Sequence, residues 1–392
     1  MCTLLPTWAE GCVLLARYTE HMSGGTQSRA FAPQTFLERW FPMPSLLLPR
    51  SIGVDISDVS VKWIGLVPVA RGGYEVATHG SLPIPSGAIQ GGAIKDTAAV
   101  AAVLKQVRIT SKVSHAHAAL PEEEAYVFSM YIPSGTPREQ AMRLIEFEFE
   151  GRVPIPIAEA VYDFDIISEE ESKGTQIGVT VFPKRLAEQY ATIFTEAGFE
   201  LVSLEIEARS IGRAIDDGAH DEYVTLLVDF GRARTGFAVL KRGIPIFTST
   251  VEFGNDIATA RAREKSSLSE EEIQRIRNDE GLFASGEHAA LRTEFEATAS
   301  GLAGEIVKHF HFWDTRRDEH GERVTPVGAV ALVGGSANMK GLVDLISGKV
   351  QASTTRPDIW RHILDFNETI PPVDKRTSLQ YVTAAGLALR GV

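Results

Sequence analysis

Residues 53–62 read Gly53-Val54-Asp55-Ile56-Ser57-Asp58-Val59-Ser60-Val61-Lys62. Apolar residues alternate on both sides of a polar turn, which predicts a strand, a tight turn and a returning strand. Backbone N–H groups of such a turn can form a nest for phosphate oxygens, and we expect it to involve Gly53, Ser57, Ser60 and Val61. Asp55 at the strand end can hold Mg²⁺ through water, and Lys62 supplies a positive charge for phosphates. Taken alone, the stretch also fits an ordinary β-hairpin.

A second stretch repeats this logic, Val228-Asp229-Phe230-Gly231-Arg232-Ala233-Arg234-Thr235-Gly236. An apolar strand ends in an acid, a small turn follows at Gly231, and Thr235 opens the returning strand. Two strand-end acids in separate halves, Asp55 and Asp229, are suited to approach one divalent cation from opposite sides. Such a cation would offset the charge of a triphosphate between two lobes.

A third stretch runs from a strand into two glycines and then a helix, Ala331-Leu332-Val333-Gly334-Gly335-Ser336-Ala337-Asn338-Met339-Lys340-Gly341-Leu342. Because glycine has no Cβ, the backbone at Gly334 and Gly335 can approach a flat or charged ligand closely. The neighbouring polar residues Ser336 and Asn338 are further candidates for ligand contacts. A Gly-Gly pair after a strand is common, so this motif is unspecific by itself.

The remaining pattern predicts alternating strands and helices in both halves of the chain. We expect strands at 74–79, 112–120, 161–167, 176–182, 199–206, 223–230, 236–240, 245–251 and 327–333, and helices at 96–107, 138–151, 183–197, 207–216, 342–347 and 381–389. Residues 256–319 are almost wholly helical in pattern. Each half opens with a strand, a turn and a strand, which indicates an α/β protein of two similar lobes.

Composition narrows the class of function. The formal net charge of -12 argues against a nucleic-acid binder, which usually carries a basic face. Of 392 residues only Cys2 and Cys12 are cysteines, so disulfides cannot hold the fold together. No apolar run is long enough to span a bilayer, so we expect no direct membrane insertion. Residues 1–44 lack periodicity, and we interpret them as a poorly ordered extension or as a mis-assigned start upstream of Met43.

In this order, the three motifs resemble the phosphate-1, phosphate-2 and adenosine motifs of the actin-like ATPase superfamily. The spacings from Asp55 to Lys62 and from Asp229 to Thr235 match that pattern, and residues 381–389 resemble its second interdomain helix. The resemblance implies two duplicated ribonuclease H-like lobes that bind ATP and Mg²⁺, with Asp55 and Asp229 holding the metal through water. Gln274 and Arg277 fill the polar places that the superfamily has near the ribose.

Within this superfamily, residues 51–392 resemble the PilM family of type IV pilus assembly proteins and its relative FtsA. The resemblance rests on segments between the shared motifs, at 148–157, 161–165, 196–200, 255–257 and 302–306. It implies lobe one at 51–220 with an inserted α/β subdomain at 121–182, and lobe two at 221–392 with a helical subdomain at 256–325. It also implies a cytoplasmic scaffold that is peripheral to the inner membrane through a partner.

That partner, by resemblance, is a PilN-like membrane protein whose N-terminal peptide enters a groove between lobe one and the inserted subdomain. Phe147, Phe149, Tyr162 and Phe164, with the turn at 154–156, are candidates to shape that groove, although they also fit the subdomain's own core. Contacts with other pilus platform proteins and self-association are implied as well.

The sequence departs from the family pattern where Ser57 and Phe253 replace usual glycines. If the first position needs a positive φ, Ser57 is strained, and we expect at most a slow ATPase. Glu148 and Glu150 are our catalytic candidates, because they lie in a segment that resembles the first interdomain helix.

Two alternatives remain at this point. An FtsA-like division filament would carry a C-terminal amphipathic helix, whereas this sequence stops at Val392. A sugar or acetate kinase of the same superfamily needs a general base at the acceptor hydroxyl, and no distinct candidate stands out.

Overall fold

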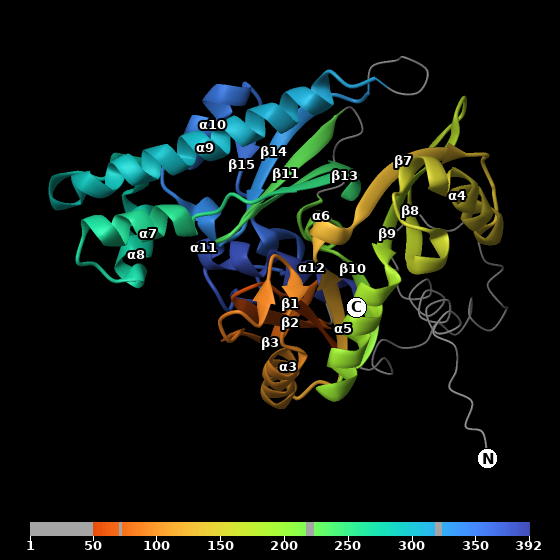
Figure 1. The fold of residues 1–392 in the computed structure, drawn as a ribbon, viewed down its shortest axis with the longest axis horizontal. Helices are drawn as coiled ribbons and strands as arrows, with labels where there is room; N and C mark the ends of the chain where they lie inside the picture. Colours follow the sequence, from red (N-terminus) through yellow and green to blue (C-terminus); the bar gives the residue numbers. More distant parts are fainter. Residues whose placement is uncertain (1–49, 70–72, 217–222, 318–323) are drawn as a thin grey trace. The chain divides into compact units, whose positions relative to one another are not determined.

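The computed structural model describes residues 50–69, 73–216, 223–317 and 324–392, so the interpretation of residues 1–44 lies outside the described part. The chain divides into two compact units (Figure 1). Of the described residues, unit 1 comprises those up to Ala214 together with Ile363–Pro372 and Thr383–Val392, and unit 2 comprises those within Ile215–His362 and Val373–Val382. In the described ranges no helix has the length and apolar character needed to cross a membrane.

The centre of unit 1 is a five-stranded sheet of order β10-β6-β1-β2-β3. Its strands are β1 (Ser51–Ile56), β2 (Ser60–Pro68), β3 (Tyr74–Pro83), β6 (His115–Leu120) and β10 (Glu200–Ile206). The β10-β6 and β6-β1 pairs are parallel, and the β1-β2 and β2-β3 pairs are antiparallel. A small hairpin of β4 (Ile89–Gln90) and β5 (Ala93–Ile94) precedes the first described helix. The sheet therefore consists of an antiparallel meander, β1-β2-β3, and two further strands, β6 and β10, that run parallel to β1.

Four helices belong with this sheet, namely α3 (Thr97–Ser111), α5 (Lys184–Glu196), α6 (Glu207–Ile215) and α12 (Val382–Arg390). Local sequence signals set two of their ends. Asp96 caps α3 by accepting a hydrogen bond from the Ala99 backbone N–H at 2.9 Å. Gly198, with a φ of 82°, follows the end of α5, which is where glycine is favoured because it carries no Cβ.

Small residues let α12 approach both β1 and α6 in unit 1. A Cβ at Gly53 would lie 2.1 Å from the Ala384 carbonyl oxygen, and one at Gly386 would lie 1.9 Å from the Ser210 carbonyl oxygen. The Ser210 hydroxyl also donates to the Thr383 carbonyl at 2.6 Å. These contacts fix α12 against the strand that carries Asp55.

A separate three-stranded antiparallel sheet of order β7-β9-β8 is inserted between β6 and α5. It consists of β7 (Tyr126–Ile132), β8 (Ala160–Glu170) and β9 (Gly174–Pro183), with α4 (Arg138–Arg152) packed on one face. Ile145 and Phe149 of α4 are fully buried against Ile177, Val179 and Val181 of β9. The segment predicted as a helix at 138–151 is therefore a helix, with an apolar face at helical spacing.

Unit 2 contains a second five-stranded sheet, of order β13-β12-β11-β14-β15. Its strands are β11 (Val224–Phe230), β12 (Thr235–Lys241), β13 (Ile244–Val251), β14 (Val327–Val333) and β15 (Ser353–Thr355). Its helices are α7 (Asp256–Lys265), α8 (Glu270–Asp279), α9 (Ala289–Asp314), α10 (Leu342–Val350) and α11 (Lys375–Ser378). Figure 1 shows α9 and α10 together beside this sheet, and α9 packs on β14.

The two sheets have the same topology. Outward from β1 come β6 and β10 on one side, both parallel, and β2 and β3 on the other, both antiparallel to their neighbours. Outward from β11 come β14 and β15, both parallel, and β12 and β13, both antiparallel. The predicted duplication of an α/β lobe is thus confirmed.

Candidate functional site

The turn between β1 and β2 is closed by serine side chains. The Ser57 backbone N–H donates to the Ser60 carbonyl at 2.9 Å, and the Ser60 N–H donates to the Ser57 hydroxyl at 3.2 Å. Among the described residues, positive φ outside glycine occurs only at Lys112, Arg242 and Gln351. The expected strain at Ser57 is therefore wrong, because its hydroxyl closes a turn that requires no left-handed backbone.

Asp55 and Lys62 face each other across this hairpin. They are cross-strand partners, with the Lys62 Nζ 3.8 Å from the Asp55 Oδ2 and both side chains nearly buried. Asp58 in the turn accepts hydrogen bonds from the Gly91 and Gly92 N–H groups at 3.2 and 3.0 Å, which ties the turn to the β4-β5 hairpin. An acid and a cation thus lie together at the end of β1, as the sequence predicts.

Two residues that were predicted to form the phosphate nest, Gly53 and Val61, lie in the strands and not in the turn between them. Gly53 lies in the strand, and the α12 backbone occupies the space where a Cβ would be. Val61 is fully buried, so only its backbone is available to a ligand. The glycine at position 53 is required by the packing of α12 against β1.

The turn between β11 and β12 is closed by the backbone of Gly231, whose N–H donates to the Arg234 carbonyl at 3.0 Å. Thr235 is fully buried, and its hydroxyl donates to the Phe253 carbonyl at 2.6 Å. The partly buried Phe253 ring stacks on the buried Phe230 ring at a centroid distance of 6.3 Å. The Thr235 hydrogen bond to Phe253 therefore stabilises the turn. The large side chain at position 253 packs against Phe230.

The Gly334 turn lies directly against Asp229. Gly334 has a φ of 86°, and a Cβ there would lie 2.4 Å from the Asp229 Oδ1 and 2.6 Å from the Phe230 carbonyl oxygen. Only glycine fits this close approach without strain. The structure thus brings together Asp229, Gly334 and Gly335, which the sequence had predicted as parts of one site.

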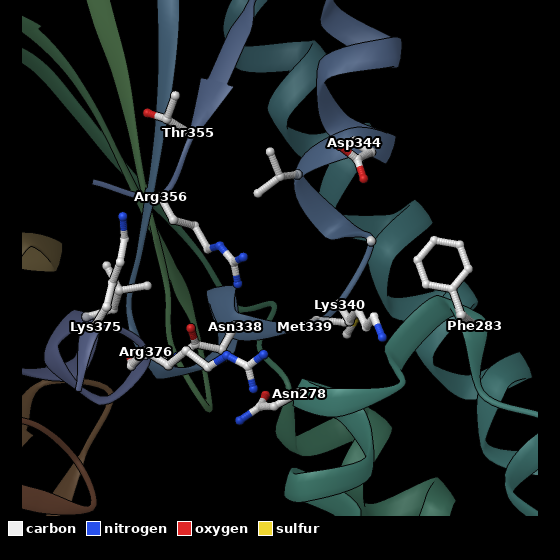
Figure 2. Close-up of a pocket in the computed structure, with 13 residues that line it drawn as sticks. Asn278, Phe283, Asn338, Met339, Lys340, Asp344, Thr355, Arg356, Lys375 and Arg376 are labelled. Atoms are coloured by element: carbon white, nitrogen blue, oxygen red, sulfur yellow. Dashed lines mark hydrogen bonds between the residues drawn. The ribbon is translucent and has the colours of Figure 1, made fainter. Parts of the chain in front are cut away.

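A pocket of about 730 Å³ opens beside this turn in unit 2 (Figure 2). Its lining comes from α8, α10, α11 and the loops next to them, and includes Asn278, Asn338, Lys340, Arg356 and Arg376. Asn338 is 5% exposed, and its Nδ2 donates to the Arg376 carbonyl at 2.8 Å. Its Oδ1 has no hydrogen-bond partner among the described residues. A buried acceptor of this kind is costly unless a ligand or water completes it.

Of the two predicted residues on α8, Gln274 is exposed and Arg277 is buried. The Arg277 Nε donates to the Asn278 Oδ1 at 3.2 Å. Burial, and then the nearby Arg232 charge, lowers the pKa of Arg277 to about 10. Neither Gln274 nor Arg277 lines the pocket, but Arg277 orients Asn278, which does. Ser336 is also buried and does not line it.

The catalytic candidates Glu148 and Glu150 lie on α4. Glu148 accepts from Arg152 at 3.2 Å, and Glu150 is exposed on a helix that packs against the inserted sheet. The interpretation of this segment as the first interdomain helix is wrong, because the helix that follows the five-stranded sheet of unit 1 is α6. The catalytic role of these two glutamates stays a prediction that their position does not favour.

Sequence reasoning missed two glutamates of unit 1. Glu207 begins α6 directly after β10, whose carboxyl end lies at the same sheet edge as that of β1 because β10, β6 and β1 are parallel. Glu122 is buried, and its Oε1 accepts from the Ala208 N–H at 2.5 Å at the start of α6. The rule that selected Asp55, an acid at a strand end, would also have selected Glu207.

Comparisons with known proteins agree with this architecture. The model of the family described as type IV pilus assembly protein PilM matches residues 53–392. No curated protein matches the chain. A solved PilM-PilN type IV pilus biogenesis complex has a TM-score of 0.71 at 18% identity, covering 87% of this chain and 98% of that one.

Two further structures have a similar fold. The ethanolamine utilization protein EutJ from Carboxydothermus hydrogenoformans has a TM-score of 0.51 at 17% identity, covering 87% of this chain and 89% of that one. MreB5 of Spiroplasma citri bound to AMPPNP has a TM-score of 0.50 at 10% identity, covering 87% and 95%. These likenesses show the actin-like ATPase fold that the three motifs predict. Since the family match spans most of the sequence, the chain belongs to the PilM family of type IV pilus assembly proteins.

Proposed function

We propose that this protein is a nucleotide-binding scaffold of type IV pilus assembly, which binds ATP with Mg²⁺ and the N-terminal peptide of a PilN-like membrane protein. One observation carries the nucleotide part. Asp55 and Asp229 stand at the same position of the same strand in two sheets of identical order. Family membership supports the pilus part, and localisation at the inner membrane would follow from the partner.

The residues present fit a bound nucleotide. Asp55 with Lys62 and the Ser57–Ser60 turn would hold phosphate and metal in unit 1. Asp229, the Gly231 turn and the Gly334 turn would do so in unit 2, with the unpartnered Asn338 Oδ1 available beside them. Two of the similar structures, both of MreB5 of Spiroplasma citri, contain AMPPNP and ADP.

The metal would take few ligands from the protein. Within the described ranges no group of three or more His, Cys, Asp or Glu side chains could hold a metal ion. Mg²⁺ commonly keeps several waters and binds through one or two carboxylates and phosphates, so a strand-end acid is a sufficient protein ligand. Bound in this way, it would offset the phosphate charge.

Calorimetry tests the nucleotide part. We expect ATP with Mg²⁺ to bind with a Kd of micromolar order, roughly -8 kcal/mol. Binding should weaken when Mg²⁺ is removed. The absence of heat and of any thermal shift at millimolar nucleotide would sink this part of the proposal.

We further propose that hydrolysis is slow, below about 10 per second. Glu207 replaces Glu148 and Glu150 as our candidate for orienting water, since it lies at the sheet edge of Asp55. A phosphate-release assay on the intact protein, with Glu207→Gln as the variant and Glu150→Gln as the matched control, checks both points. Rapid turnover without a partner, or loss of turnover only in the control, would contradict them.

The inserted sheet supports the peptide part of the proposal. Val179 and Val181 of β9 point toward α4, so alternation places Gly178 and Thr180 on the opposite face. Asp165 of β8 is the cross-strand partner of Gly178 and accepts a hydrogen bond from the Arg209 Nε of α6 at 2.8 Å. At Gly178, Thr180 and Asp165 this face has small and polar residues and is linked to α6, which suits an extended peptide that binds through backbone hydrogen bonds and a few side chains.

Of the aromatic residues predicted to shape the groove, Phe149 belongs to the subdomain core. Tyr162 and Phe164 pack partly against that core, while Phe147 on α4 is 85% exposed. Phe147 therefore lies on the outer face of α4 and serves as the matched control for the proposed face.

The experiment is calorimetry of the intact protein with a synthetic peptide from the N-terminus of the neighbouring PilN-like protein. We expect Asp165→Ala to weaken binding at least about tenfold, and Phe147→Ala to leave it unchanged. No binding by the intact protein, or the reverse order of the two variants, would show that the partner site lies elsewhere.

A further inference from the structure

The pocket beside the Gly334 turn is basic, although the chain as a whole carries a formal net charge of -12. Its lining contains one acid, Asp344, and four cations, Lys340, Arg356, Lys375 and Arg376. A pocket that received only a neutral base would have no use for such an excess of positive charge. The composition therefore indicates an anionic group in the ligand.

Two of these cations are already paired. Arg376 donates to the Asp279 Oδ1 at 2.7 Å, and the Lys375 Nζ lies 3.4 Å from the Asp358 Oδ2. For Arg356 and Lys340, no side-chain hydrogen bond or ion pair occurs among the described residues. Two positive charges of the pocket are thus available to a ligand.

Arg356 is the more informative of the two. Figure 2 shows its guanidinium inside the ring of lining residues, reaching toward Asn338 and Arg376. Burial, and then the charge of Arg376, lowers the pKa of Arg356, and Asp344 opposes this only in part. A half-buried guanidinium held next to another cation is costly, and a bound anion would relieve that cost.

Asn338 adds a second, independent requirement. Its Nδ2 donates to the Arg376 carbonyl at 2.8 Å and lies 3.5 Å from the Gly335 carbonyl. Turning the amide over would set oxygen against oxygen, so the Oδ1 is the atom left without a partner. A ligand of this pocket should therefore carry an N–H or O–H donor for the Asn338 Oδ1 and an anionic group for the cations. A phosphorylated ribose or nucleotide carries both.

We infer that this pocket binds a phosphate group on the ribose of a nucleotide, in addition to the 5′-phosphates that the strand-end turns would hold. None of its lining residues belongs to the Asp229–Thr235 turn, so the two phosphate positions use different parts of unit 2. The inference rests on the proposed nucleotide site and names a more specific ligand class for it. Planar, bidentate recognition of phosphate is what an arginine such as Arg356 provides.

The test compares ligands that differ by one phosphate. Calorimetry of the full chain at low salt is run with AMP, adenosine 3′,5′-bisphosphate and adenosine 2′,5′-bisphosphate. We expect one bisphosphate to bind at least about tenfold more tightly than AMP, because hydrogen bonds to charged groups contribute that much. Arg356→Gln should remove this advantage.

Lys349→Gln is the matched control, because Lys349 is an exposed cation on α10 outside the pocket. It removes the same charge and should keep the advantage of the bisphosphate. Equal affinities for AMP and both bisphosphates in the native protein, or an advantage that survives Arg356→Gln, would overturn the inference. If ATP with Mg²⁺ still binds in that case, the proposed nucleotide function stands and only the ribose phosphate is wrong.

Inorganic pyrophosphate distinguishes the two sources of phosphate. It should compete with the bisphosphate, and Arg356→Gln should weaken this competition. Pyrophosphate that binds at Arg356 without any advantage of a bisphosphate over AMP would overturn the nucleotide as the source and assign the pocket to a free anion.

Discussion

β1 and β11 occupy the same place in two sheets of the same strand order, yet the residues that face their acids differ. Asp55 pairs across its hairpin with Lys62, whereas Asp229 pairs with Gly236 and lies against Gly334. The first acid therefore has a cation beside it within the lobe, and the second has a close glycine turn. Equal topology does not imply equal electrostatics.

The difference continues two residues earlier in each strand. Gly53 pairs with His117 in the first sheet, while the corresponding pair in the second sheet is Leu227 and Ala331. Gly53 makes room for α12, and His117 is buried with its Nδ1 2.7 Å from the Ser203 hydroxyl. The second sheet has an apolar pair at the same level. The two lobes therefore share a strand order, and each lobe adapts it to its own covering helices.

The largest effect should come from filling the space at Gly53. In Gly53→Ala the new Cβ would meet the Ala384 carbonyl oxygen and the Ala388 nitrogen, both backbone atoms that cannot rotate away. We expect a loss of about 3 kcal/mol or more in unfolding free energy, at the upper end for overpacking. Denaturant unfolding measures it.

Gly304→Ala on α9 is the control, since nothing lies within 4 Å of a Cβ there. It should be neutral or stabilising by up to about 1 kcal/mol, because alanine favours a helix over glycine. A Gly53→Ala protein as stable as this control would show that the glycine has no packing role.

The next effect is the pH dependence of stability, which arises from a buried histidine of the first sheet. Burial, and then the Arg390 charge, lowers the pKa of His117 to about 3. The unfolded chain binds a proton below about 6.5 and the folded one does not, so stability falls as the pH drops from 6.5 toward 3. This group alone should cost about 2 kcal/mol at pH 5 relative to pH 7.

Denaturant unfolding at the two pH values checks this, with His117→Asn as the variant and His115→Asn as the control. The imidazole of His115 lies 3.2 Å from the exposed Glu200 carboxylate at the surface. The His117 variant should lose less stability on acidification than the native protein. An identical pH dependence in both variants would show that His117 does not remain neutral in the fold.

Metal-dependent nucleotide binding tests whether the two acids are equivalent. We expect Asp55→Asn and Asp229→Asn each to weaken ATP binding in Mg²⁺ by about tenfold, or ~1.4 kcal/mol. Lys62→Gln should weaken ATP binding with and without Mg²⁺, because its charge acts on phosphate directly.

The control is Glu171→Gln, an acid in the exposed loop between β8 and β9. Calorimetry with ATP, with and without Mg²⁺, measures the affinity of each of these variants. Loss of metal dependence in Glu171→Gln, or its persistence in both aspartate variants, would contradict the assignment of the two acids.

The smallest effect should come from Ser57→Gly. A strained serine would be relieved by glycine, but the Ser57 hydroxyl accepts from the Ser60 N–H and donates to the Ser60 carbonyl at 3.0 Å. We therefore expect a loss of stability of about 1 kcal/mol or less, not a gain. Thermal unfolding decides it, and a stabilised variant would restore the strain hypothesis.

The features that the sequence determined are local or repeated. Alternation at 52–63 depends on neighbouring residues, so the periodicity rule located it, and the cap at Asp96 and the glycine at 198 follow equally local rules. The three motifs were recognisable because spacing within a turn is set by the backbone itself. Asp55, Lys62 and Asp229 are placed where that spacing predicts.

Tertiary structure alone decided the features that depend on distant contacts. Gly53 meets Ala384, Ser210 meets Thr383 and Arg209 meets Asp165, and no local pattern in any of these segments names its partner. The same holds for α4. Its acidic residues resembled the first interdomain helix, but its apolar face packs on the inserted sheet. The basic pocket with its unpartnered Asn338 Oδ1 arises from residues of α8, α10 and α11 that meet only in the folded chain. Packing and burial, which need the whole chain, fixed these roles, whereas periodicity and turn chemistry needed only a few residues at a time.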